Sequence, residues 1–198
     1  MRFIFSERVI LMKFFHQHRT ILCLCEGAIL LALAQVLGYL KFWRMPWGGS
    51  VTLCMVPVLL YAVRWGLGPG LGVGFLLGCL QFLLDGGFVI GWQSILGDYV
   101  FSYLVLGFAG FFRGRKNGCI WGTLTGCALR WVVLFITGAV VWGEYMPDVF
   151  FGLTMTSPWL YSALYQTAYM VPNMALCLLV FSLLGRYMQK YLTGKDLR

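Results

Sequence analysis

Residues 118–142 read GCIWGTLTGCALRWVVLFITGAVVW and carry one charged side chain, Arg130. As an α-helix with a rise of ~1.5 Å per residue, this stretch is ~37 Å long, which exceeds the ~30 Å of a bilayer's hydrocarbon core. A segment this long and this apolar predicts a transmembrane helix.

The same pattern recurs along the chain. Further apolar runs predict helices at about 20–42, 51–65, 69–90, 92–112 and 158–186. Of 198 residues, 60% are hydrophobic and 11% are charged, and the mean hydropathy is +0.80, whereas a soluble domain carries about a quarter charged residues. We therefore predict an all-α integral membrane protein, a six-transmembrane-helix bundle whose membrane domain covers residues 20–187.

Basic residues are distributed unevenly between the loops. With a cytoplasmic N-terminus, the inner segments hold most of the fifteen Lys and Arg residues, namely Arg2, Arg8, Lys13, Arg19, Arg64, Arg113, Arg115, Lys116, Arg186, Lys190, Lys195 and Arg198. The outer segments hold only Lys41 and Arg44. The positive-inside rule therefore places both termini in the cytoplasm and requires an even number of helices. The net charge of +8 thus reflects membrane topology, and we expect no nucleic-acid partner.

The two ends of the chain are predicted to lie outside the membrane domain. Residues 1–19 combine aromatic and basic side chains, which predicts a basic helix at the membrane interface. Residues 188–198 are predicted to form a cytoplasmic tail. With six spans between these ends, we expect a multi-pass protein of the plasma membrane.

Two charged side chains lie deep in the predicted spans. Asp98 lies about 14 residues from the inner end of its helix, and Arg130 about 12 residues from the inner end of the next, so they lie ~21 Å and ~18 Å deep. An unpaired charge there costs at least ~2.5–3.5 kcal/mol, so each needs a partner or a hydrated cavity. Two interpretations follow: Asp98 and Arg130 form a structural ion pair, or Asp98 faces a cavity and binds a cationic ligand.

Aromatic side chains cluster toward the outer half of the last two helices. Trp142 ends the fifth, and Tyr161, Tyr165 and Tyr169 share one face of the sixth, with Gln166 beside them. Such residues at helix ends commonly anchor a protein at the membrane interface, but part of this stripe lies deeper. Aromatic faces beside a carboxylate also suit a flat cationic heterocycle. The sequence therefore leaves two roles open for this stripe of tyrosines, helix packing and ligand binding.

Other chemistries find little support in the sequence. Seven cysteines lie mostly in apolar runs without clustered metal ligands, so we interpret them as packing residues and expect no metal or cofactor. An intramembrane enzyme needs a general base or a nucleophile pair, and no histidine lies in a predicted span. An ion or proton carrier is a further alternative, although Asp98 and Arg130 alone give a poor path across the membrane.

A series of short motifs runs through residues 20–185. They are Trp47-Gly-Gly-Ser-Val-Thr-Leu, Arg64-Trp-Gly, Leu96-Gly-Asp98-Tyr99, Leu129-Arg130-Trp131, Ile136-Thr-Gly138-Ala, Trp142-Gly-Glu-Tyr145-Met-Pro147, and Tyr161-Ser followed by Tyr165-Gln-Thr-Ala-Tyr169-Met-Val-Pro172. In this order and spacing they resemble the thiamine-specific substrate-binding (S) component of energy-coupling-factor (ECF) vitamin transporters.

The resemblance implies a six-helix protein that captures thiamine from outside and works with a membrane coupling subunit and two cytosolic ATPases. In that family an acidic residue of helix four meets the cationic ligand, which corresponds to Asp98. The neighbouring aromatic corresponds to Tyr99, the stacking tryptophan to Trp142, and the helix-six tyrosine and amide to Tyr161 and Gln166. The chain itself contains no Gly-x-x-x-x-Gly-Lys-Ser/Thr motif for ATP binding.

The remaining predicted substrate-binding residues are Trp47, Gly138, Tyr165 and Arg130. In helix one, Ala28-Ile-Leu-Leu-Ala32 resembles the family's small-residue motif that packs against the coupling subunit.

Three positions depart from the family pattern. Leu134 replaces a histidine, Gln166 replaces an asparagine, and Trp47 stands where many relatives have glutamine. The alternative function is therefore capture of a different small vitamin or of a pyrimidine-like precursor.

Overall fold

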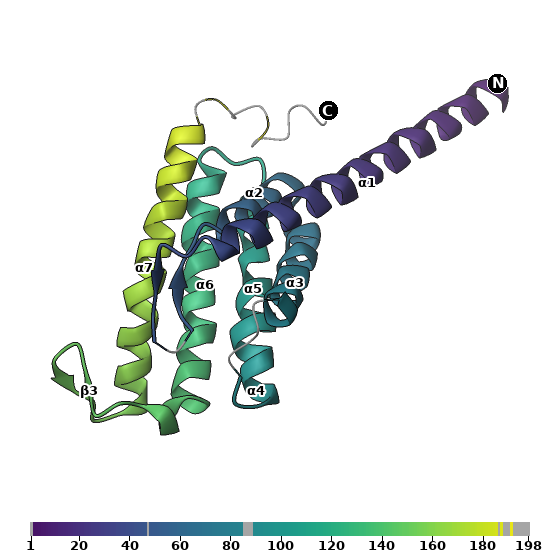
Figure 1. Ribbon diagram of the computed structural model, residues 1–198. Helices are drawn as coiled ribbons and strands as arrows, with labels where there is room; N and C mark the ends of the chain where they lie inside the picture. The colour runs from purple at the N-terminus through teal and green to yellow at the C-terminus, as the bar shows by residue number, and fades with distance from the viewer. Residues whose placement is uncertain (1, 47, 85–88, 186, 188–190, 192–198) are drawn as a thin grey trace.

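Long apolar helices form the body of the protein (Figure 1). A computed structural model describes residues 2–46, 48–84, 89–185, 187 and 191, with side chains from residue 17 onward. Within these residues, five helical stretches are long and apolar enough to cross a membrane, namely Gln17–Tyr39, Leu67–Leu84, Trp92–Phe112, Gly118–Val140 and Pro158–Gly185. The predicted helical membrane bundle is confirmed.

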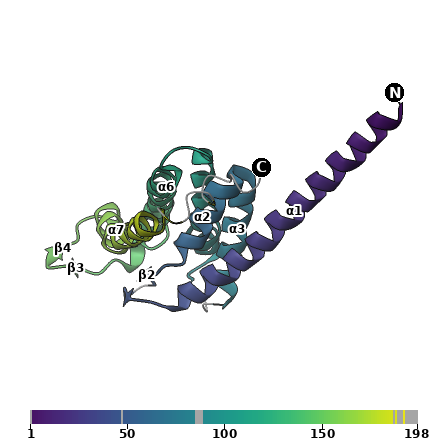
Figure 2. The same ribbon diagram turned by 90° about the horizontal axis from the view of Figure 1, so that it is seen from above.

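The first helix, α1 (Arg2–Tyr39), is longer than predicted. We expected an interfacial segment over 1–19 and a separate span over 20–42, but one helix runs through both without interruption. Its 38 residues extend over ~57 Å. α1 packs against the second and third helices, and its N-terminal part extends beyond the bundle (Figures 1 and 2). Contact of that part with the membrane interface stays a prediction.

The second predicted helix, 51–65, is shorter in the structure. Two short strands, β1 (Trp43–Arg44) and β2 (Ser50–Val51), pair antiparallel before it, and α2 covers only Met55–Trp65. An 11-residue helix is ~16 Å long and does not span a bilayer.

The β1–β2 hairpin supplies the missing length of this crossing. The backbone N–H of Thr52 donates to Asn173 Oδ1 at 2.9 Å, and Asn173 lies about 22 Å along α7 (Pro158–Gly185) from its first residue. The hairpin therefore reaches the middle of the bundle, where α2 begins. The hairpin and α2 together therefore occupy the place of the second predicted span.

The fourth crossing, Trp92–Phe112, is not a regular α-helix. Its successive parts are α4 (Trp92–Ser94), the π-helical turn η1 (Ile95–Phe101), α5 (Ser102–Leu104) and the 3₁₀ segment η2 (Val105–Phe112). The helix α3 (Leu67–Leu84) packs along it with its glycines. A Cβ at Gly74 would lie 2.5 Å from the carbonyl oxygen of Tyr103, and one at Gly78 would lie 2.5 Å from that of Tyr99. Only glycine allows these backbones to approach so closely.

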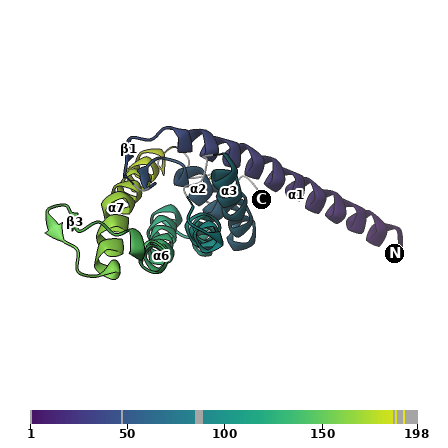
Figure 3. The same cartoon turned by 60° about the horizontal axis from the view of Figure 1, so that its bottom comes forward.

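The last two spans, α6 (Gly118–Val140) and α7, lie side by side (Figure 1). Ser162 Oγ donates to the carbonyl oxygen of Phe135 at 2.8 Å and joins them near their outer ends. They are connected on the outer side by η3 (Gly143–Tyr145) and a second hairpin, β3 (Val149–Phe150) with β4 (Leu153–Thr154). This hairpin projects beside α7 (Figure 3).

A polar cluster joins α1 and α2 at the inner end of the bundle. Arg64 is buried, and its Nε and Nη2 donate to the Glu26 carboxylate at 2.7 and 3.0 Å. Trp65 Nε1 donates to the same carboxylate at 2.7 Å, and Arg64 Nη1 donates to the carbonyl oxygen of Tyr191 at 2.7 Å. These bonds hold α1 and α2 together at the inner end of the bundle.

Candidate functional site

A cavity lies between the β1–β2 hairpin and the helices, with an empty volume of about 1140 Å³ that includes the part open to solvent. The helices α1, α2, α3, α6 and α7 contribute to its wall, together with η1, α5 and η3. The predicted site residues that line it are Asp98, Tyr99, Arg130, Gly138, Trp142, Tyr161, Tyr165 and Gln166. Trp47 lies outside the residues that the structure describes.

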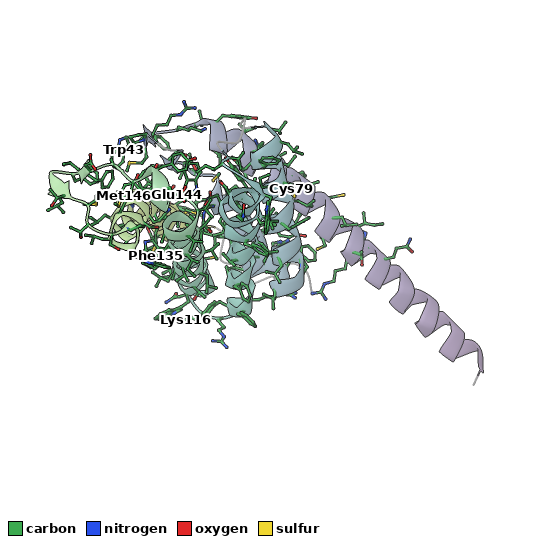
Figure 4. All side chains as sticks on the ribbon, turned by 90° about the horizontal axis from the view of Figure 1, so that it is seen from below. Trp43, Cys79, Lys116, Phe135, Glu144 and Met146 are labelled. Carbon is green, nitrogen blue, oxygen red and sulfur yellow. The ribbon has the colours of Figure 1, made fainter. Side chains whose placement is uncertain are left out.

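The outer side of the bundle shows how these elements meet (Figure 4). The hairpin that carries Trp43 lies next to the outer ends of α6 and α7, where Glu144 and Met146 are labelled. Phe135 lies on the opposite side of α6 and stacks on Trp131, with ring centroids 5.1 Å apart. The cavity therefore lies on the hairpin side of these helices, and other aromatics cover the far side.

Asp98 is held by two hydrogen bonds to one of its oxygens. Ser94 Oγ and Trp142 Nε1 both donate to Asp98 Oδ2, each at 2.8 Å. Ser94 lies one turn earlier on the same crossing, and Trp142 lies at the end of α6, so two elements orient the carboxylate. No described residue donates to Oδ1, which leaves that oxygen for a ligand.

The carboxylate lies within the π-helical turn η1, a kind of turn that often marks functional sites. Neighbours pack tightly against this turn on both sides. Gly97 faces Thr137 of α6 so closely that a Cβ would overlap its hydroxyl, and Gly78 of α3 meets the backbone of Tyr99. The turn is therefore fixed in place, and Asp98 and Tyr99 both reach the cavity.

Arg130 and Asp98 line the same cavity but do not form an ion pair. Among the described residues, the ion pair found in the structure joins Arg64 and Glu26. Arg130 is 8% exposed, and its guanidinium carbon lies 3.7 Å from the centre of the Tyr103 ring. Its Nε and Nη1 have no hydrogen-bond partner among the described residues. Of the two interpretations that the sequence left open, the structure supports a cavity between the two charges rather than a structural pair.

Tyrosines of α7 form one wall of the cavity. Tyr161, Tyr165 and Tyr169 are buried, and successive ring centroids lie 5.6 and 5.9 Å apart. Phe150 of the β3–β4 hairpin packs against the first two of them, at 5.3 and 5.9 Å. This stripe of three tyrosines therefore lines the cavity rather than forming an interfacial belt.

Gln166 is engaged by the protein at both ends of its amide. Its Nε2 donates to the carbonyl oxygen of Leu134 at 3.2 Å, and its Oε1 accepts a short hydrogen bond from the Tyr169 hydroxyl. A Cβ at Gly138 would lie 3.0 Å from this Nε2 and 2.5 Å from Ser162 Oγ, so glycine is required there. Gln166 thus shapes the cavity wall beside Leu134.

The β1–β2 hairpin forms the wall opposite α6. Asn173 Nδ2 donates to the carbonyl oxygen of Ser50 at 2.9 Å, while its Oδ1 accepts the Thr52 N–H. The Gly49 N–H donates to the Tyr165 hydroxyl at 3.2 Å. Backbone that is not helical needs such partners inside a membrane, because lipid offers none.

Comparison with known proteins assigns this architecture to a family. The family model described as "Thiamine transporter protein (Thia_YuaJ)" matches residues 24–193. The chain belongs to the thiamine transporter family. A thiamine transporter ThiT of Bacillus subtilis is 32% identical over 184 residues, covering 85% of this chain and 93% of the relative. One of Lacticaseibacillus paracasei is 25% identical, covering 91% and 94%.

A solved structure shares the fold. ThiT from Listeria monocytogenes superimposes with a TM-score of 0.76 at 21% sequence identity, covering 87% of this chain and 98% of that one. Thiamine transporters of this kind are transport proteins rather than enzymes, and the chain is a multi-pass protein of the plasma membrane. The family resemblance drawn from the motifs is confirmed.

Several cavity residues were not predicted from the sequence. They are Lys41, Ser50, Thr52, Gln81, Tyr103 and Asn173. Gln81 and Asn173 are amides within apolar runs, so the argument that singled out Asp98 applied to them as well. Ser50 and Thr52 gave no such signal, because their position depends on a hairpin that the hydropathy pattern conceals.

The predicted partner-contact residues lie away from the cavity. Ala28 and Ala32 are exposed on α1, whereas Gly27 and Ala34 of the same helix are buried. The two small side chains therefore face outward, where lipid or a partner helix can reach them.

Proposed function

We propose that this thiamine transporter family member captures thiamine from outside the cell, as the S component of an ECF importer. One observation carries the proposal: the Asp98 carboxylate lies in an aromatic-lined cavity with Oδ2 fixed by Trp142 and Ser94. Thiamine offers a permanent cation and flat rings. The cation neutralises Asp98, and the rings pack against Trp142 and the α7 tyrosines.

Binding alone does not move the vitamin, and energy is proposed to come from partners. Ala28 and Ala32 present a small-residue surface on α1, four residues apart and therefore on one helix face. In lipid, helices associate through such surfaces because their backbones can approach closely. A membrane coupling subunit is proposed to pack there and to link the chain to two cytosolic ATPases.

Titration calorimetry of the purified protein with thiamine tests the binding site. Asp98→Asn removes the charge and keeps the shape of the side chain. We therefore expect the affinity for thiamine to fall more than tenfold, which corresponds to a loss of more than about 1.4 kcal/mol of binding free energy. Glu144→Gln is the matched control, because Glu144 is exposed and lies outside the cavity wall. Equal affinity of Asp98→Asn and the wild type would remove Asp98 from the site.

The identity of the vitamin has its own test. Mass spectrometry of small molecules that co-purify with the protein should find thiamine. A different vitamin or an uncharged compound in its place would contradict thiamine capture and favour the alternative raised by Leu134.

A further inference from the structure

Gln81 is a buried amide in a helix that is otherwise almost entirely apolar. It lies on α3, whose sequence is LGPGLGVGFLLGCLQFLL, and it is 5% exposed. A polar side chain inside a membrane bundle is costly unless its hydrogen-bonding groups are satisfied. Gln81 also lines the cavity. Its amide nitrogen and its amide oxygen therefore each need a hydrogen-bond partner.

One end of the amide is used by α1. Gln81 Nε2 donates to Gln35 Oε1 at 3.3 Å, and Gln35 Nε2 donates in turn to the Tyr39 hydroxyl at 3.3 Å. Gly38 of α1 lies against the same nitrogen, since a Cβ there would be 2.6 Å from Gln81 Nε2. The amide nitrogen is therefore directed at α1 within a chain of three polar side chains.

The amide oxygen, Gln81 Oε1, remains available to a ligand in the cavity. The amide plane directs Oε1 away from Nε2, and no described residue donates a hydrogen bond to this oxygen. Among the polar groups that line the cavity without a described partner are both donors and acceptors. Arg130 Nε and Nη1 are donors without a described acceptor, whereas Gln81 Oε1 and Asp98 Oδ1 are acceptors.

The two acceptors differ in charge and therefore in the ligand group that each prefers. A carboxylate attracts a cation, whereas a neutral amide oxygen is matched by a neutral N–H or O–H donor. A ligand that satisfies both acceptors needs a cation and a separate neutral donor. Thiamine carries both kinds of group: the cationic thiazolium, and neutral donors in its exocyclic amine and its hydroxyl.

We propose that Gln81 is a specificity-determining residue of the site, whose Oε1 accepts a hydrogen bond from a neutral donor of the ligand. This rests on the proposed thiamine capture. The donor is the exocyclic amine of the pyrimidine or the hydroxyl of the side chain. Ligands that lack this donor leave Gln81 Oε1 unsatisfied in a buried position and therefore bind more weakly.

The test measures the affinity of three ligands for three proteins. The ligands are thiamine, a thiamine analogue in which hydrogen replaces the exocyclic amine, and a thiamine analogue without the hydroxyl. The proteins are the wild type, Gln81→Leu and Gln35→Leu. Gln35 is the matched control, because it belongs to the same amide pair and does not line the cavity.

We expect Gln81→Leu to weaken thiamine binding roughly 3- to 10-fold, the usual range for one neutral hydrogen bond. The loss should disappear for the analogue that lacks the donor and persist for the other, and this identifies the amine or the hydroxyl as the donor. Gln35→Leu leaves the carbonyl oxygen of Gln81 in place, so any loss should be the same for all three ligands.

A second variant guards against misfolding of Gln81→Leu. Gly38→Ala places a methyl group 2.6 Å from Gln81 Nε2 and must displace the amide, so it should give the same ligand pattern. Equal losses for all three ligands, or no loss for any, would overturn the role of Gln81. Failure of thiamine capture itself has a different signature, namely a wild-type protein that binds no thiamine.

Discussion

Trp142 has two roles in the site. Its ring lines the cavity, and its indole Nε1 donates a hydrogen bond to the Asp98 carboxylate. The sequence predicted the ring and did not predict the hydrogen bond. A buried carboxylate requires donors, but the donors come from a serine four residues earlier and a tryptophan 44 residues later. Only the folded chain brings these groups together.

Replacement of Trp142 by phenylalanine should destabilise the empty protein. Trp142→Phe keeps an aromatic ring and removes the Nε1 donor, so Asp98 loses one of the two hydrogen bonds to Oδ2. Hydrogen bonds to charged groups contribute about 1.5–3 kcal/mol, and we expect a loss of stability of that order. Thermal unfolding in detergent, followed by fluorescence, measures it.

Trp121→Phe is the control for this change. Trp121 lies on α6 and is 56% exposed, so its replacement should alter stability by less than ~0.5 kcal/mol. Equal shifts in the two variants would show that the indole donor of Trp142 has no special contribution.

Single polar residues in apolar runs were the most informative signals at the residue scale. Asp98 and Arg130 were found in this way, and the structure places both on one cavity. Gln81 and Asn173 carry the same signal and were overlooked, because amides cost less in a membrane than charges do. The absence of an Asp98–Arg130 ion pair could not be predicted, since depth along two helices does not give the rotation of either.

Asn173 connects two elements, the β1–β2 hairpin and α7, through backbone atoms. It accepts from the Thr52 N–H, donates to the Ser50 carbonyl oxygen, and also donates to the Tyr169 carbonyl oxygen of its own helix at 2.8 Å. One side chain therefore satisfies the backbone on both sides of Val51, in the middle of the bundle.

Asn173→Ala should loosen the hairpin. It leaves the Thr52 N–H and the Ser50 carbonyl oxygen without a partner, and each such buried group costs about 1–3 kcal/mol. Hydrogen–deuterium exchange should show a clear loss of protection at the Thr52 amide. Ser182→Ala, at an exposed serine that bonds only its own helix, should leave that amide unchanged. Unchanged protection in Asn173→Ala would mean that Asn173 does not hold the hairpin.

The contact between α3 and the fourth crossing depends on glycine, and two glycines of α3 provide a matched pair. Gly74→Ala places a Cβ 2.5 Å from a backbone oxygen of Tyr103 that cannot move aside, whereas Gly72→Ala meets nothing within 4 Å. We expect the first to destabilise by ~1–3 kcal/mol and the second to be neutral or stabilising by up to ~1 kcal/mol. Thermal unfolding of both variants checks this. A Gly74→Ala protein as stable as Gly72→Ala would contradict the close packing.

Hydropathy predicts helices well and breaks in helices poorly. The runs at 118–142 and 158–186 match α6 and α7 within a few residues. The π-helical turn around Asp98 was missed, because hydropathy does not register the close contacts of Gly97 and Gly78 that surround it. The hairpin was missed because residues 51–65 form one apolar run, although only Met55–Trp65 of it is helical.

At the scale of the whole molecule, the charge distribution predicts the orientation. The basic loops predict that the polar cluster of Glu26 and Arg64 lies on the cytoplasmic side, with the cavity toward the outside. The hairpin and α2 together occupy the place of the second predicted crossing. Among the described residues, a count of long helices gives five, whereas the basic loops predict an even number of crossings.

Disruption of the α1 surface should separate transport from binding. Ala28→Leu together with Ala32→Leu adds bulk to the exposed face of α1, where close approach of a partner helix needs small side chains. We expect thiamine affinity to stay within twofold of the wild type, while uptake by cells that contain the coupling subunit and ATPases falls at least tenfold. Ile29→Leu, at an exposed neighbour, is the control. Normal uptake by the double variant would place the partner contact elsewhere.

The contacts between the β1–β2 hairpin and α7 have an evolutionary consequence. On the hairpin side, the atoms that bond to α7 are the Gly49 and Thr52 amide nitrogens and the Ser50 carbonyl oxygen, all of them main-chain atoms. These hydrogen bonds therefore do not depend on which side chains Ser50 and Thr52 carry, so these two cavity-lining positions can diverge between relatives without losing them. Natural selection can retune which vitamin is accepted in this segment while the helices, on which the stability of the protein depends, stay unchanged.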